Sequence, residues 1–148
     1  MRAIKQFNQF IENGVVKEQS PDISRAEFLR EESKKSYSFL QKKLNVFGIT
    51  EETANDLIKS CYDIIMELIR SKMLLEGYNA SGQGAHEAEV SYLRIIGFKE
   101  KDVQFADQLR YFRNGMLYYG TVLDEEYAQK VIDFTNKAYG ELSKQEEI

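Results

Sequence analysis

The chain has 148 residues, a formal net charge of −4 at neutral pH and one cysteine, Cys61. This is the size of one ordinary domain, spanning 1–148, and it needs no disulfide or metal to fold. The single cysteine excludes a disulfide framework, and the mild charge excludes nonspecific polyanion binding by the whole surface. No segment has the roughly 18 apolar residues of a membrane span or the core of a signal peptide, so we expect a cytoplasmic protein.

Apolar residues recur at helical spacing along most of the chain, which predicts an all-α, up-and-down bundle of about five to six helices. Ile4, Phe7 and Ile11 predict a short first helix that stops at Gly14. Residues 15–24 are expected to form a connection. A long helix then begins at an Asp22 or Ser24 cap and ends at Gly48. No strand is expected, because no segment shows strand-like alternation bounded by turns.

The third helix has the widest apolar face in the chain and is therefore expected to be central. Thr50 is its predicted cap, and Gly77 is its predicted end. Residues 80–84 form the clearest predicted loop. The apolar positions are Ala54, Leu57, Ile58, Cys61, Ile64, Ile65, Leu68 and Leu75.

Three further helices are predicted in the C-terminal half. The fourth runs from about Ala85 to Ile96. The fifth begins near Lys101 or Asp102 and ends at Tyr119, before a glycine. The last follows Asp124, with two glutamates in its first turn, where carboxylates favour the helix dipole.

The fifth helix carries the main candidate site. On a helical wheel, its core stripe of Phe105, Leu109, Phe112 and Met116 falls within roughly 60°. A second face presents two guanidinium groups, an amide and a phenol. Arginine forks match phosphate oxygens, and a tyrosine ring can stack on a base. The candidate ligand-binding residues are Arg110, Arg113, Asn114 and Tyr118. The same face could equally be solvated or form a dimer.

His86 is the only histidine in the chain. One histidine and one cysteine do not supply the ligands of a zinc or di-iron site, so no metal and no cofactor is expected. At a predicted helix start, His86 is more typical of a cap or a local hydrogen-bond partner than of a catalyst. It remains a possible accessory residue of the site.

The run Arg113-Asn114 late in an amphipathic helix, followed by aromatics and a glycine, resembles the HEPN family (higher eukaryotes and prokaryotes nucleotide-binding domain). A second likeness extends from Gly77-Tyr78-Asn79 to His86-Glu87-Ala88, and the apolar third helix fits as well. The resemblance covers roughly 28–139. It implies a helical bundle that commonly forms homodimers, and many members are toxins paired with a small nucleotidyltransferase antitoxin.

In the ribonuclease members of this family, an arginine and a histidine separated by four to six residues meet at the dimer cleft. By position, the arginine corresponds to Arg113, and with four intervening residues the histidine position holds Tyr118. A phenol with a pKa near 10 is a poor base at neutral pH, whereas a histidine can act as acid or base. The resemblance therefore implies a protein that is weakly catalytic or inactive.

Three functions follow as expectations. The first is a homodimeric HEPN-like bundle that binds nucleotide or RNA, as part of a toxin–antitoxin or defence system. The second is a non-enzymatic bundle whose Arg110–Tyr118 face only forms a dimer or docks a partner protein. The third is a metal-independent ribonuclease that uses Arg113 with Tyr118 or His86.

Overall fold

Six helices account for most of the residues that the computed structural model describes, which are 3–119 and 123–144. Side chains are described for 3–115 and 123–143. The predicted all-α fold is confirmed. The helices are α1 (Phe7–Glu12), α2 (Ile23–Phe47), α3 (Ala54–Leu75), α4 (Ala85–Ile96), α5 (Glu100–Tyr119) and α6 (Glu125–Lys144). None of them is long and apolar enough to cross a membrane over the residues described.

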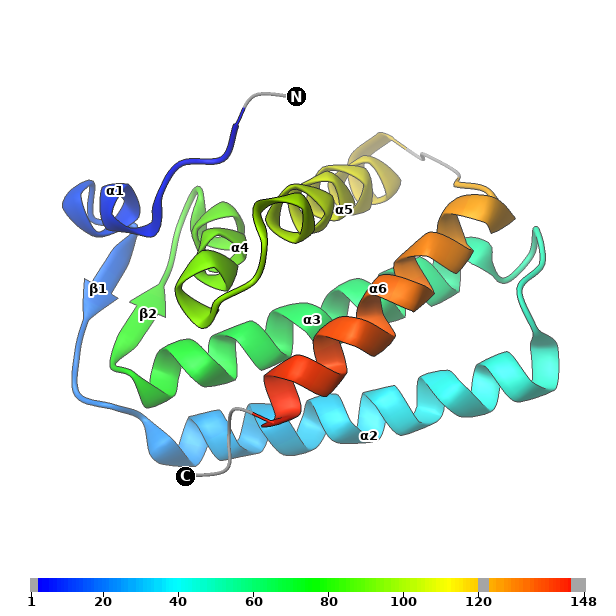
Figure 1. Cartoon of the computed structure of the whole chain (residues 1–148), viewed down its shortest axis with the longest axis horizontal. Coiled ribbons are helices and arrows are strands. Elements are labelled where there is room, and N and C mark those ends of the chain that lie inside the picture. Colours follow the sequence, from blue (N-terminus) through cyan, green and yellow to red (C-terminus); the bar gives the residue numbers. More distant parts are fainter. Residues whose placement is uncertain (1–2, 120–122, 145–148) are drawn as a thin grey trace.

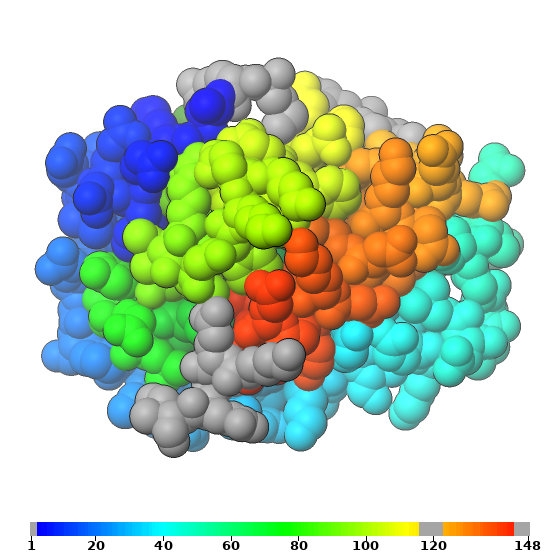
Figure 2. Space-filling view, viewed as in Figure 1, coloured from blue at the N-terminus to red at the C-terminus, as the bar shows by residue number. Residues whose placement is uncertain are grey.

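The two longest helices, α2 and α3, form an antiparallel hairpin that runs the length of the molecule (Figure 1). Helices α4, α5 and α6 pack on α3, with α6 crossing it on one side and α4 and α5 above it, while α1 packs on α4. On the face shown in Figure 2, α6 (orange to red) lies between the α4–α5 pair and α2. Tyr37 of α2 joins α6 by donating a hydrogen bond to Asn136 at 2.7 Å and by stacking on Tyr139. Helix α3 therefore lies at the centre of the bundle.

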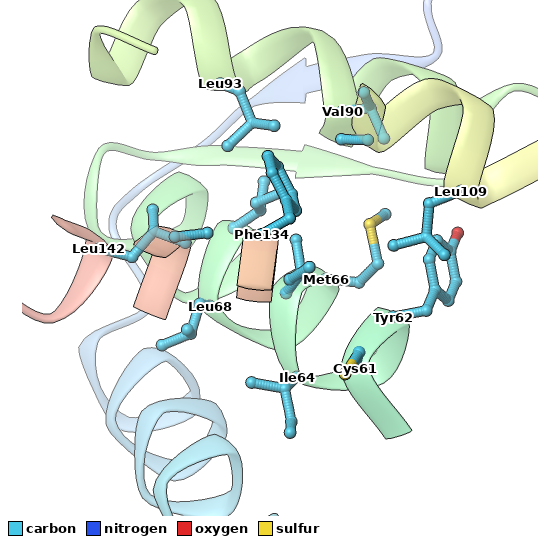
Figure 3. Close-up of a cluster of buried hydrophobic side chains, with 14 of the residues drawn as sticks. Cys61, Tyr62, Ile64, Met66, Leu68, Val90, Leu93, Leu109, Phe134 and Leu142 are labelled. Atoms are coloured by element: carbon cyan, nitrogen blue, oxygen red, sulfur yellow. The ribbon is translucent and has the colours of Figure 1, made fainter. Parts of the chain in front are cut away.

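The core is built on the apolar face of α3, as the sequence predicts. All of its predicted positions are buried except Leu75, which is partly buried at the end of the helix. Figure 3 shows Cys61, Ile64 and Leu68 among side chains that come from α4, α5 and α6. Burial raises the pKa of the Cys61 thiol to about 11, so this cysteine behaves as a small hydrophobic residue.

The prediction that the chain contains no strand was wrong. Val16–Glu18 (β1) and Tyr78–Ala80 (β2) pair antiparallel, with Lys17 opposite Asn79. Strands of three residues are too short to show a period-two pattern. The two strands also lie about sixty residues apart in the sequence, so neither segment predicts the pairing. The two-stranded ribbon fixes the start of α2 against the loop that leads into α4 (Figure 1).

One of the two predicted caps is confirmed, and the other was wrong. The Asp22 carboxylate accepts a hydrogen bond from the backbone N–H of Arg25 at 3.1 Å, which caps α2. The third helix begins later than predicted, at Ala54, after Thr53. Thr50 instead belongs to a turn, in which its N–H donates to the Thr53 hydroxyl oxygen at 2.9 Å and that hydroxyl donates to the Gly48 carbonyl. The turn has its own hydrogen bonds and therefore replaces the predicted first helical turn.

Gly77 has two reasons to be glycine: its φ is +83°, and an added Cβ would overlap the Gln19 carbonyl oxygen beside the ribbon. Gly14 has the same φ, but an added Cβ would meet nothing within 4 Å. Both alanine variants should lose stability through left-handed strain, about 1–2 kcal/mol. Gly77→Ala should lose about 1–3 kcal/mol more than Gly14→Ala because it also forces a backbone clash. Urea unfolding of both variants measures the difference, and equal losses would contradict the close approach.

Candidate functional site

The predicted ligand face of α5 is partly buried. Arg110, Arg113 and Asn114 are each half-buried, and the exposed aromatic of this segment is Tyr111. The predicted core stripe is correct at Leu109, which is fully buried, while Phe105 and Phe112 are only partly covered. Helix α5 lies against both α4 and α3. The side chains of Met116 and Tyr118 lie outside those that the structure describes, although α5 includes both positions.

Arg110 is paired with a carboxylate of its own helix. Its Nε donates to Asp107 Oδ1 at 2.8 Å, and the Asp107 side chain is only 8% exposed. A carboxylate so poorly solvated holds the guanidinium firmly, because removing one partner would leave the other charge without compensation. Arg110 is therefore a positioned and partly neutralised cation.

Arg113 has the opposite environment. Its Nε is buried and has no hydrogen-bond partner, and no carboxylate of the described chain pairs with its guanidinium. Four of the six described arginines do pair with a carboxylate, namely Arg30, Arg70, Arg94 and Arg110. The two that do not are Arg25 and Arg113. A half-buried guanidinium without a counter-charge is a potential anion site.

The structure places His86 in a different cluster, at the start of α4. Its Nδ1 lies 2.8 Å from Glu89 Oε1, and Arg70 Nε donates to the other carboxylate oxygen, Oε2, at 2.7 Å. The Glu89 side chain is only 5% exposed, whereas that of His86 is 54% exposed. No described hydrogen bond or ion pair joins this cluster to Arg113. The hypothesis that His86 assists Arg113 is therefore not supported by a direct contact between described side chains.

The contacts of His86 define its tautomer. An Arg70 Nη2 also lies 3.3 Å from Nδ1, but an arginine can only donate, and Nδ1 cannot both accept from Arg70 and donate to Glu89. The shorter, charge-assisted contact with the buried carboxylate decides the question, so Nδ1 carries the proton. Nε2 is then the nitrogen free to accept a proton or, once protonated, to donate to a ligand.

A cavity of about 120 Å³ adjoins this cluster. Its wall includes Arg25 from the start of α2, Arg70 from α3, and His86 and Glu89 from α4, with Tyr78 and Asn79 of β2. The β-ribbon, which the sequence did not predict, brings these elements together. Three basic side chains and one buried carboxylate therefore border one small cavity.

Tyr62 of α3 interacts electrostatically with charged groups of both clusters, that of Arg110 on α5 and that of Arg70 and Glu89. Its hydroxyl is buried without a hydrogen-bond partner, and Figure 3 shows it beside Leu109 at the edge of the core. Burial, followed by the charge of Glu89, raises the pKa of Tyr62 to about 12, and the charges of Arg110 and Arg70 oppose that rise. Tyr62 is thus within reach of charges from both the α4 and the α5 cluster, but it remains a neutral phenol at ordinary pH.

Sequence reasoning missed Arg25, Arg70, Glu89 and Tyr62 as site residues. One signal was present for Glu89. It falls among the buried residues Ala88, Val90 and Leu93 on a short amphipathic helix, and it lies three residues after the only histidine. A carboxylate at a core-facing position requires a partner, and residues three apart share a helix face. The signal did not identify Arg70, whose approach depends on how α3 and α4 pack.

Comparison of the chain with protein-family models, with curated proteins and with solved structures found no match. Across residues 3–119 and 123–144, no three histidine, cysteine or carboxylate side chains lie close enough together to hold a metal ion. The described side chains of the two clusters offer arginine and histidine groups as partners for an anion.

Proposed function

We propose that this chain is a HEPN-like helical protein that binds the phosphate groups of RNA or a nucleotide through Arg113 of α5. The observation that carries the proposal is the environment of Arg113: a half-buried guanidinium with a buried, unpartnered Nε and no ion pair with any carboxylate among the described side chains. A buried donor without an acceptor costs about 1–3 kcal/mol, so an arginine held in this way supports an anionic ligand at its exposed end.

Neighbouring features of α5 support the same role. Arg110 is fixed by Asp107 one turn before Arg113, and Asn114 adds a half-buried amide on the adjacent position. Tyr118 would supply a ring for base stacking from the next turn of the helix. We further propose a homodimer in a toxin–antitoxin or defence system, with a small nucleotidyltransferase antitoxin as partner. These biological roles rest on the family resemblance alone.

The proposed activity is binding rather than cleavage. Cleavage of RNA without a metal needs one group to accept the 2′-hydroxyl proton and another to protonate the leaving oxygen. The only histidine of the chain donates from Nδ1 to Glu89 and has no described hydrogen bond or ion pair with Arg113, and the family's histidine position holds Tyr118. A tyrosine can donate a hydrogen bond but is almost wholly protonated at neutral pH.

Arg113→Ala should weaken binding of a short single-stranded RNA or of ATP by about ten- to a hundredfold, because a charge-assisted hydrogen bond contributes about 1.5–3 kcal/mol. Arg30→Ala is the matched control, since it removes an exposed arginine that already pairs with Glu31 on α2. Fluorescence titrations at low and moderate salt measure both variants. The wild-type affinity should fall steeply with salt, because phosphate contacts release counterions.

The same titrations include the outcomes that would overturn the proposal. If the wild type bound neither probe at low salt, the phosphate-binding function would be wrong. If Arg30→Ala weakened binding as much as Arg113→Ala, the effect would reflect net charge rather than the α5 site. If the wild type cleaved the RNA and Tyr118→Phe abolished cleavage, the protein would be a ribonuclease and the binding-only proposal would fail.

A second candidate function is self-association or docking without a ligand. It is favoured by the large apolar side chains that the chain exposes on α2 and α5, namely Ile23, Phe28, Phe39, Val46, Phe47 and Tyr111. Exposed apolar groups of this kind often mark protein contacts, and a closed two-fold dimer is the commonest way to cover them. Absence of nucleotide and RNA binding, together with twice the chain mass in light scattering, would favour this function over the first.

A further inference from the structure

We propose that the cavity bordered by α2, α3, α4 and β2 is a second anion site, which binds a terminal phosphate group through Arg25, Arg70 and His86. The site is independent of the α5 face, because no described hydrogen bond or ion pair joins its residues to Arg113. It combines a cavity of about 120 Å³ with basic side chains from three helices. None of these elements forms the site by itself.

The charges on the cavity wall are unbalanced in favour of an anion. Arg25 has no carboxylate partner in the described chain, whereas the charge of Arg70 is offset by Glu89. Two guanidinium groups therefore face one carboxylate before His86 is counted. Glu67, whose charge also interacts with Arg70, lies one turn earlier on α3 and is not part of the cavity wall. An incoming anion would therefore compensate Arg25 directly.

Glu89 holds two of the site's side chains in position. Its two oxygens hold two different side chains, Arg70 through Nε and His86 through Nδ1, at 2.7 and 2.8 Å. The carboxylate is almost fully buried and both of its oxygens are hydrogen-bonded within the protein, although Glu89 also lines the cavity. Two cation-forming groups are thereby held in fixed positions, which reduces the entropy that ligand binding would otherwise cost.

His86 offers the ligand its second nitrogen. Because Nδ1 donates to Glu89, Nε2 is the ring nitrogen left for a ligand, and it donates to a phosphate oxygen in the imidazolium form. Asn79 and Tyr78 also line the cavity, as do the apolar residues Met73, Leu74, Ala80 and Ala85. A tetrahedral phosphate accepts several donors from different directions, as guanidinium, imidazolium and amide groups from separate elements would supply here.

The size of the cavity limits the ligand. A single water needs roughly 10–15 Å³, so a cavity of about 120 Å³ admits a group of roughly ten non-hydrogen atoms or fewer. A phosphate group fits this description, and a whole nucleotide does not. The cavity is partly open to solvent, so the remainder of a phosphomonoester would extend outwards. The terminal phosphate of a small metabolite and that of a nucleic-acid end share this chemistry.

His86 is also the probe for the test, because it is the only histidine in the chain and gives one set of imidazole resonances. Inorganic phosphate, added to the full-length protein at constant pH and ionic strength with chloride as the exchanged anion, should shift these resonances saturably. Arg25→Gln should weaken the apparent affinity by about tenfold or more, since it removes a charge-assisted contact. The Arg25 side chain is exposed. The hydrogen bond that caps α2 uses the backbone N–H of Arg25, which the substitution keeps, so this variant should keep the fold.

Two further comparisons identify the source of the phosphate group and separate the cavity from the α5 site. A 5′-phosphorylated short RNA that competes better than ribose 5-phosphate would indicate a nucleic-acid end, and the reverse order a small metabolite. The 5′-hydroxyl form of that RNA should leave His86 unshifted. Arg113→Ala should leave phosphate binding at His86 unchanged, so loss at α5 and loss at the cavity are separable. No saturable shift, or equal affinity in wild type and Arg25→Gln, would overturn the second site.

Discussion

Ile65→Ala should lower the free energy of unfolding by about 2–5 kcal/mol, the usual range for shortening a fully buried aliphatic side chain to alanine. Ile65 lies midway along α3 and is only 2% exposed, within the core that α4, α5 and α6 also contact. Because α3 is surrounded on several sides, its neighbours cannot collapse fully into the space that the lost atoms leave. The cost should therefore include a cavity term in addition to the lost transfer free energy.

Ile95→Ala is the matched control for this experiment. It makes the same chemical change on α4, where the isoleucine is 59% exposed. We expect its effect to stay within about 0.5 kcal/mol, as for most surface substitutions. Urea unfolding followed by circular dichroism measures both variants. Similar small losses for the two would contradict the central position of α3.

The central position of α3 was predictable because its signal is local and redundant. Many apolar residues at helical spacing point to one broad face, and no single exception changes the outcome. The same holds for the Asp22 cap, which depends on a side chain and a backbone N–H three residues apart. The start of the third helix was predicted too early because Thr50 and Thr53 bond each other in the reciprocal pattern of a capping box, but the residues between them form a turn and the helix begins at Ala54.

The candidate site was predictable only in part, and for a physical reason. A helical wheel gives the face on which Arg113 lies, but it does not tell how closely α3 and α4 cover that face. Arg110, expected to face a ligand, pairs instead with Asp107, a residue one turn earlier whose burial the wheel did not show. The cavity beside His86 could not be predicted from the sequence, because it depends on the pairing of β1 with β2.

The six described arginines connect these observations. Those paired with a carboxylate stabilise or position local structure, as when Arg94 binds Glu100 and the carbonyls of Ile4 and Lys5. Those without one, Arg25 and Arg113, belong to the two candidate anion sites. The position of an arginine in the sequence does not show whether it pairs with a carboxylate. Burial and the identity of the nearest carboxylate do, and both require the packed structure.

Glu89→Ala should cost about 3 kcal/mol of stability, near the lower end of the range for breaking a buried ion pair, because Arg70 keeps some contact with solvent. The loss arises less from the missing attraction than from the charge that stays behind without a partner. Replacing both residues, as Arg70→Met with Glu89→Leu, should therefore recover most of it. The exposed pair Glu126–Lys130, at 3.9 Å, is the control, and Glu126→Ala should change stability by less than about 1 kcal/mol. Chemical unfolding of the three variants measures these differences. A double variant as unstable as Glu89→Ala would show that the carboxylate is needed for its own packing, and that its pairing with Arg70 and His86 does not explain its burial.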